Sequence, residues 1–322
     1  MRRRFLLLLI IIPILLFVVK LFIKPHDPSK VAGISSSREL LSPLAKFNPV
    51  DEKLLEKAVQ AQLTGTTGKY GIAVLNLKNN DSYFLNEHRK YKTGSLYKLW
   101  VMAVALEQIK KGTLRENDIL SQDKDELYKK FGIDTPAPSG EAISPAPTLT
   151  EEEKEANKIT LLVSEALEKM IIISDNDAAL LLSERIRLIN ATSFLEKNSF
   201  SESKLGAAGG YPTTTPYDIA LFLKKLYKGE LADKEYTEKM LTLLKRQRLN
   251  GKLPKYLPEG TVIAHKTGEL DEFTHDAGIV YAQTGDYIIV VLSESDARAQ
   301  AEERISNVSK AVYEYFTQAE EQ

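Results

Sequence analysis

The sequence predicts an α+β fold in which one antiparallel sheet, formed from both ends of the folded chain, packs against an all-helical subdomain. Strand-like segments lie toward these two ends, while the long middle, from 96 to about 249, is mostly helical. A final amphipathic helix closes the sequence. The strand-like segments are 70–77 and 82–85 at the start, and 277–282 and 286–293 at the end.

Composition excludes several classes of function. Among 322 residues, 43 Lys and Arg nearly balance 44 Asp and Glu. Such a chain has no general electrostatic attraction to nucleic acid, so no nucleic-acid partner is expected. It contains no cysteine, which excludes disulfides, a cysteine nucleophile and thiolate metal sites.

The first 23 residues predict a membrane anchor. Three arginines precede an apolar run at 5–23, interrupted only by Pro13 and Lys20. As a helix this run measures about 28 Å, close to the hydrocarbon thickness of a bilayer. The arginines favour a cytoplasmic N-terminus, which predicts a single-pass protein of the cell membrane with an extracytoplasmic domain. A cleaved signal peptide is the alternative, although no small-residue cleavage pattern follows the run directly.

The remaining elements follow in order. Residues 24–48 are rich in Pro and Ser without periodicity, so we expect a tether, followed by a folded domain at 49–318. The apolar face of 51–63 predicts a first helix. Residues 121–156 contain four prolines and many acids, and we expect a solvated loop or insertion. Further helices are expected in the middle of the domain, at 99–109, 159–173 and 178–189.

Ser95 and Lys98 are the first candidates for chemistry. They lie three residues apart where an apolar helix begins, so their side chains share one helical face. A serine hydroxyl is a weak nucleophile until a base removes its proton, and a desolvated lysine can be that base. The same spacing occurs at 121–124 and 201–204, so this pattern alone is more typical of a helix cap with a solvated lysine than of a catalytic pair.

Two further motifs strengthen the case. Ser174-Asp175-Asn176 occurs once, between two apolar helices. Lys266-Thr267-Gly268 follows a predicted strand at 261–265. A second Lys-Thr-Gly occurs at 92–94, but only the later copy follows a strand.

Together the three motifs resemble those of the penicillin-recognising serine enzymes, specifically the class A β-lactamase family of bacteria. The flanking segments 170–179, 213–216 and 275–280 resemble the same family. The resemblance implies a β-lactamase/transpeptidase-like fold over about 49–316. It also implies a serine hydrolase acting on β-lactams or peptidoglycan peptides, with no cofactor or metal.

The resemblance also implies roles for individual residues. Lys98 would accept the Ser95 proton, and Ser174, beside Lys266, would protonate the leaving nitrogen. Lys266 and Thr267 would bind the substrate carboxylate, and Asn176 would bind its amide side chain. Gly268 belongs to the same strand motif. The backbone N–H groups of Ser95 and Glu269 would bind the oxyanion.

One segment departs from the family. Class A β-lactamases resemble one another in a Glu-x-x-Leu-Asn omega loop whose Glu activates the deacylating water, but residues 206–215 contain no acid. Glu196 and Glu202 lie nearby and are expected to be solvated. Three hypotheses follow: a β-lactamase that activates water in another way, a penicillin-binding D,D-carboxypeptidase or transpeptidase acting on D-Ala-D-Ala peptides, and a non-catalytic domain that binds cell-wall peptide.

Other chemistries have weaker support. The four histidines have no zinc-binding spacing, and we expect structural hydrogen bonding for His265 and His275. The glycine-rich segment 65–69 lacks the spacing of a phosphate-binding loop.

Overall fold

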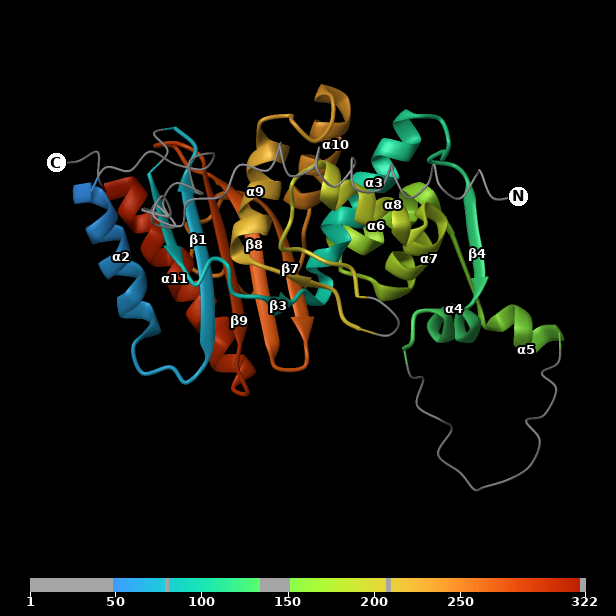
Figure 1. The fold of residues 1–322 in the computed structure, drawn as a ribbon, viewed down its shortest axis with the longest axis horizontal. Helices are drawn as coiled ribbons and strands as arrows, with labels where there is room; N and C mark the ends of the chain where they lie inside the picture. Colours follow the sequence, from blue (N-terminus) through green and yellow to red (C-terminus); the bar gives the residue numbers. More distant parts are fainter. Residues whose placement is uncertain (1–48, 79–80, 134–150, 207–209, 319–322) are drawn as a thin grey trace, which may run out of the picture. The chain divides into compact units, whose positions relative to one another are not determined.

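A computed structural model describes residues 49–78, 81–133, 151–206 and 210–318 of the chain. Its main sheet has five strands in the order β2-β1-β9-β8-β7, and every neighbouring pair is antiparallel (Figure 1). The strands are β1 (Lys69–Asn76), β2 (Ser82–Leu85), β7 (Val262–Leu270), β8 (Phe273–Tyr281) and β9 (Tyr287–Glu294).

The sheet joins the two ends of the domain, as the sequence predicts. β1 pairs with β9 along its whole length, from Lys69 opposite Glu294 to Asn76 opposite Tyr287. The α+β class with an antiparallel sheet is therefore confirmed. β7, which carries Lys266-Thr267-Gly268, lies at the edge of the sheet.

Helices cover both faces of the sheet. Alternate residues of β9 divide between two hydrophobic cores: Val290 and Leu292 pack with the helical subdomain, whereas Ile289 and Val291 pack with α2 and α11. Because both faces are covered, seven of the eight β9 residues are buried. The two helices of the second core are α2 (Pro49–Leu63) and α11 (Arg298–Gln318).

The helical subdomain is built around α3, whose first nine residues, including Trp100, are all buried. Surrounding helices pack their apolar stripes against it or against the sheet. The segment η2 (Gly94–Tyr97) leads into it. The helices are α3 (Lys98–Lys110), α6 (Val163–Ile172), α7 (Asn176–Ile186), α8 (Leu188–Lys197), α9 (Pro216–Tyr227) and α10 (Lys234–Lys245).

The segment 121–156, expected to be a solvated loop or insertion, contains regular structure at both ends: α4 (Lys124–Lys130) and α5 (Glu151–Ala156). These helices lie between two strands that pair with each other, β4 (Ile119–Asp123) and β5 (Lys158–Leu162). The helix expected from residue 159 consequently starts at Val163, because the four residues before it pair with β4. Two short strands, β3 (Tyr91–Lys92) and β6 (Thr213–Thr214), form another ribbon.

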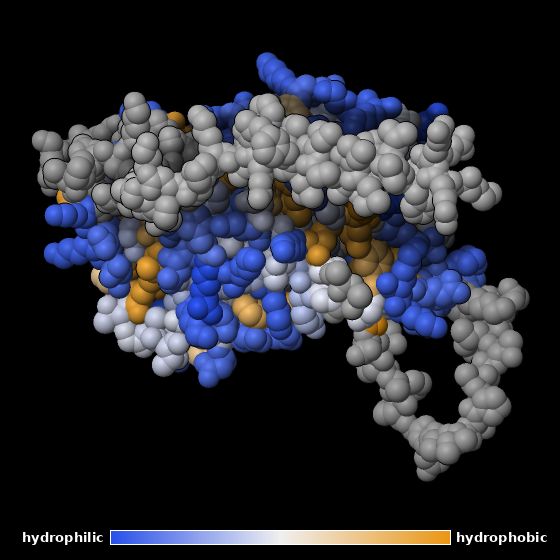
Figure 2. All heavy atoms as spheres, viewed as in Figure 1, coloured by the Kyte–Doolittle hydropathy of each residue, from blue (hydrophilic) through white to orange (hydrophobic). Residues whose placement is uncertain are grey.

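The predicted anchor at 1–23 and tether at 24–48 lie outside the described residues. Within the described part of the chain, no helix is both long enough and apolar enough to span a bilayer. On the face in Figure 2, hydrophilic side chains cover much of the described surface and hydrophobic ones form separate patches.

Candidate active site

Ser95 lies in η2, pressed against the strand that carries Lys266-Thr267-Gly268. Gly94 has φ +48°, and a Cβ there would lie 2.5 Å from the backbone nitrogen of Glu269. A Cβ on Gly268 would lie 2.6 Å from the carbonyl oxygen of Thr93 and 2.9 Å from Leu96. Only glycine permits both approaches, so these two positions bring the chain on either side of Ser95 into contact with β7.

Lys98 is a fully buried lysine at the first turn of α3. Its Nζ donates to the carbonyl oxygens of Ser174 (2.6 Å) and Asp175 (3.2 Å) and to Oδ1 of Asn176 (2.8 Å), and lies 3.4 Å from Ser174 Oγ. Burial lowers the pKa of Lys98 to about 8, although the Asp175 carboxylate opposes that shift. A substantial fraction of the lysine is therefore neutral near physiological pH.

Lys266 approaches the same serine from the sheet. Its Nζ donates to Ser174 Oγ at 2.8 Å and to the carbonyl oxygen of Thr267 at 2.9 Å. Burial, followed by the positive charge of Lys98, holds the pKa of Lys266 well below its usual range. Because Ser174 Oγ accepts from Lys266, its own proton remains free to be donated.

Ser174 itself has an unusual backbone. Its φ of +59° is in the left-handed region, which a residue with a Cβ adopts at some cost in energy. The surrounding contacts hold it there: Asp175 donates its N–H to the carbonyl of Lys169 and caps α7 by accepting from Ala178. This turn directs both the carbonyl and the hydroxyl of Ser174 toward the two lysines.

The structure therefore brings together Lys98, Ser174, Asn176 and Lys266 by direct hydrogen bonds. Ser95 joins them through its backbone position, three residues before Lys98, and its hydroxyl has no hydrogen-bond partner among the described residues. Thr267 is buried beside Lys266, whereas Asn176 is exposed. Since Asn176 Oδ1 faces the lysine, its Nδ2 group is directed elsewhere.

Both site histidines have the structural role predicted for them. His275 Nδ1 accepts from the backbone N–H of Ser293, so its Nε2 carries the proton that it donates to the carbonyl of Lys92. Burial lowers the pKa of His275 to about 4, which keeps it neutral. His265 Nδ1 lies 2.9 Å from the buried carboxylate of Asp276.

The side chain of Glu269 has partners that the motifs did not reveal. Lys252 Nζ lies 2.7 Å from Glu269 Oε1, and the Arg298 guanidinium binds Oε2. Both cations come from segments distant from the motif in sequence. No residue pattern marks them as members of the site.

The acid-free segment adjoins the nucleophile. Thr213 and Thr214 pair with Tyr91 and Lys92, and the Pro212 carbonyl accepts from the N–H of Thr93, two residues before Ser95. Residues 207–209 lie outside the described residues. No acid occurs anywhere in this segment, as its sequence shows.

The two nearby acids have different surroundings. Glu196 is exposed, as expected. Glu202 is not the solvated charge that we expected: its carboxylate lies 2.9 Å from His88 Nδ1 and accepts from the Thr215 hydroxyl at 2.7 Å.

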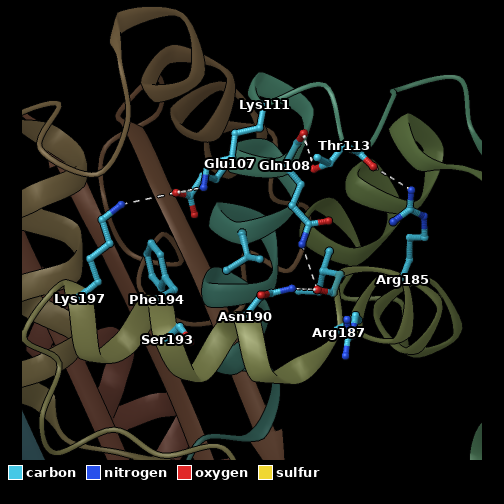
Figure 3. Close-up of a pocket in the computed structure, with 12 residues that line it drawn as sticks. Glu107, Gln108, Lys111, Thr113, Arg185, Arg187, Asn190, Ser193, Phe194 and Lys197 are labelled. Carbon is cyan, nitrogen blue, oxygen red and sulfur yellow. Dashed lines mark hydrogen bonds and ion pairs between the residues drawn. The ribbon is translucent and has the colours of Figure 1, made fainter.

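A surface pocket of about 480 Å³ lies at the other end of α3, between α7 and α8 (Figure 3). Its lining includes Glu107, Lys111 and Lys197 but none of the predicted site residues. Glu107 lies nine positions after Lys98 in this helix, which is about 14 Å along its axis. The pocket is therefore separate from the candidate active site. Among the described residues, no group of three or more His, Asp or Glu is placed to hold a metal ion.

Comparison with known proteins agrees with this geometry. A profile of the beta-lactamase enzyme family matches residues 53–316. The chain is 24% identical over 289 residues to beta-lactamase VEB-1 of Pseudomonas aeruginosa, covering 80% of this chain and 89% of that protein. It is 21% identical over 306 residues to the extended-spectrum beta-lactamase PER-1 of the same organism, covering 88% and 94%.

Solved structures share the fold. PBP-A superposes with a TM-score of 0.70 at 21% identity, covering 86% of this chain and 99% of that one. A point mutant of PBP-A, equally similar, is described as an acyl-enzyme complex with penicillin G. The class A resemblance predicted from the three motifs is confirmed: this chain belongs to the beta-lactamase enzyme family and is a serine hydrolase of the β-lactamase type.

Proposed function

We propose that the chain is a class A β-lactamase-like hydrolase in which β-lactams acylate Ser95. The observation that carries the proposal is the continuous contact from Lys98 through Ser174 to Lys266, with Ser174 Oγ 3.4 Å from one amine and 2.8 Å from the other. VEB-1 and PER-1, whose names describe β-lactamases, support the substrate class.

Acylation would begin at Ser95. In its neutral form, Lys98 takes the Ser95 proton as the hydroxyl oxygen attacks the lactam carbonyl, and a new C–O bond forms. Ser174 then donates its free proton to the lactam nitrogen as the C–N bond breaks, and it recovers a proton from Lys98. Lys266 maintains a hydrogen bond to Ser174 throughout and, with Thr267, holds the substrate carboxylate.

The remaining groups position the substrate. The backbone N–H groups of Ser95 and Glu269 belong to segments in contact and would stabilise the oxyanion, where losing one donor typically costs about 100- to 1000-fold in rate. The exposed Asn176 amide would bind the acyl side chain.

Deacylation separates this proposal from a second candidate. The segment 206–215 contains no acid to activate water, and its residues 212–214 bind the chain that leads to Ser95. This observation favours a penicillin-binding D,D-peptidase, which acts on D-Ala-D-Ala peptides and retains a β-lactam as a long-lived acyl-enzyme. The similarity to PBP-A agrees with it. A domain that only binds peptide would not need Ser95, Lys98, Ser174 and Lys266 together, so their presence disfavours the non-catalytic hypothesis.

Time-resolved mass spectrometry of the whole chain with penicillin G tests both candidates. We expect an adduct of one penicillin G on the chain and none on Ser95→Ala. An adduct that disappears within seconds while hydrolysed penicillin accumulates supports the β-lactamase, and an adduct that persists for hours supports the peptidase. If the unsubstituted chain neither forms an adduct nor turns over penicillin, the proposal is wrong.

The predicted anchor at 1–23 completes the proposal: a single-pass protein with its hydrolase domain outside the cytoplasm. Support comes from the apolar run at 5–23 and the three arginines before it. Deleting residues 1–23 should move the protein from the membrane fraction to the soluble fraction. Recovery of the deleted form in membranes would contradict the anchor.

A further inference from the structure

The carboxylate of Glu269 is shared between two cations beside the candidate active site. Lys252, whose side chain is only 5% exposed, holds Oε1 at 2.7 Å, and Arg298, the first residue of α11, holds Oε2. Arg298 also binds Glu302 at 3.1 Å through its Nε atom. Two cations and two carboxylates thus form a cluster with no net charge.

This cluster lies close to the reacting groups. Glu269 directly follows Gly268, and its backbone nitrogen is in contact with Gly94, next to Ser95. Lys252 and Glu269 also act on the buried amine of Lys266: Lys252 lowers the pKa of Lys266, whereas Glu269 raises it. The charges of both residues therefore reach the place where Lys266 and Thr267 would hold a substrate carboxylate.

A substrate carboxylate at that position would be attracted by Lys252 and Arg298 if they were unpaired. The Glu269 side chain already satisfies one hydrogen-bonding direction of each cation, and its negative charge repels a second carboxylate. Glu269 is thus an internal carboxylate that occupies the two cations which would otherwise attract a substrate carboxylate. Its 38% exposed side chain borders solvent, so a substrate can approach it.

We propose that Glu269 is a specificity-determining residue that neutralises Lys252 and Arg298 and so weakens the selection for substrates with a free carboxylate. This inference rests on the proposed acylation of Ser95. It predicts that the site tolerates substrates whose carboxylate is esterified or amidated better than a site without this acid would.

The test compares second-order acylation rates for penicillin G and penicillin G methyl ester, measured on the whole chain. Glu269→Gln keeps the length of the side chain and an oxygen for Lys252 while removing the charge. We expect it to raise the ratio of acid to ester rates by about three- to tenfold, as one charge at this range can, with the increase shrinking in high salt. Glu303→Gln is the matched control: it removes the same charge from α11, where Glu303 binds Lys255 and Tyr256, and should leave the ratio unchanged.

For a second variant we expect the ratio of acid to ester acylation rates to change in the opposite direction. Arg298 is 47% exposed, so Arg298→Gln should fold, and the less compensated Glu269 should lower the ratio. If Glu269→Gln leaves the ratio unchanged or lowers it while the unsubstituted chain is acylated, the inference alone fails. If the unsubstituted chain is acylated by neither compound, the proposed function fails and the inference with it.

Discussion

Lys98 shows how local chemistry determines whether one side chain can act as a base. Burial favours its neutral form, whereas the nearby Asp175 carboxylate favours its charged form, and burial has the larger effect. The pKa of about 8 lies close to the pH at which a general base works best. The ability of Lys98 to act as a base therefore comes from its surroundings, because an exposed lysine would be protonated at this pH.

Asp175→Asn should shift the pH dependence of acylation. In the unsubstituted chain we expect the rate to rise with pH through a midpoint near 8, as Lys98 loses its proton. Without the Asp175 charge the ammonium form is less favoured, so the pKa of Lys98 falls and the midpoint moves to lower pH. Asn still caps α7, since it can accept from Ala178. The measurement is the acylation rate by penicillin G from pH 5.5 to 9.5.

Asp177→Asn provides the control for that shift. Asp177 is two residues further along and binds Lys124 and Tyr128 rather than the site. Its substitution should leave the midpoint in place. A midpoint that stays fixed in Asp175→Asn, or moves upward, would contradict the assignment of Lys98 as the base.

At the residue scale, the sequence predicts the residues of the three motifs better than it predicts the side chains that contact them. Ser95, Lys98, Ser174 and Lys266 could be proposed because three motifs occur together in one order, although two of these motifs also occur elsewhere in the chain. Lys252 and Arg298 could not, since each is an ordinary cation until the fold brings it to Glu269. The positive φ of Ser174 could not be predicted from the sequence either, because tertiary contacts impose it.

At the scale of elements, a helix or strand could be predicted from the sequence when its signal lies within its own residues. The long helix α3 and the strands β1 and β9 each have a continuous apolar run within one segment, which is a local signal. β4 and β5 are five residues each, partly exposed, and pair with each other across more than thirty residues, so no local signal reveals them. The apolar residues 159–162 fit a strand or a helix equally well, which explains the misplaced start of α6.

The junction of α7 and α8 offers a test of backbone strain. Arg187 has φ +62° and ψ 115°, which a side chain makes costly, and its own side chain has no partner among the described residues. Arg187→Gly should stabilise the protein by about 1 kcal/mol, or about 2–4 °C in Tm. Thermal unfolding followed by circular dichroism measures it.

Arg185→Gly, in the last turn of α7, should do the reverse. It replaces a good helix former with glycine, at a cost of up to about 1 kcal/mol, and removes the hydrogen bond from Arg185 to the carbonyl of Thr113. Equal destabilisation by both substitutions would show that position 187 is not strained.

At the scale of the whole molecule, the sheet connects two hydrophobic cores. Ile305 of α11 is buried in one core, and Trp100, the only tryptophan, is buried in the other. The strands between them contribute alternate residues to both cores, so we expect the domain to unfold in one transition.

Ile305→Ala tests this coupling. Removing a buried isoleucine typically costs about 2–5 kcal/mol. Trp100 fluorescence and far-ultraviolet circular dichroism should both show the lower midpoint in a urea titration, whereas Gln300→Ala, on the exposed side of α11, should leave it unchanged. A Trp100 midpoint that stays fixed while the circular dichroism signal shifts would show that the helical subdomain unfolds independently.

The pairing of β1 with β9 has a consequence for biosynthesis. β1 is made first, but its partner lies more than two hundred residues later, near the end of the chain. While the ribosome synthesises the middle, β1 and β2 can form a hairpin, but one edge of β1 stays open to any other strand. Folding of the sheet must therefore wait until translation is nearly finished, and a nascent chain arrested before Tyr287 would expose an aggregation-prone edge.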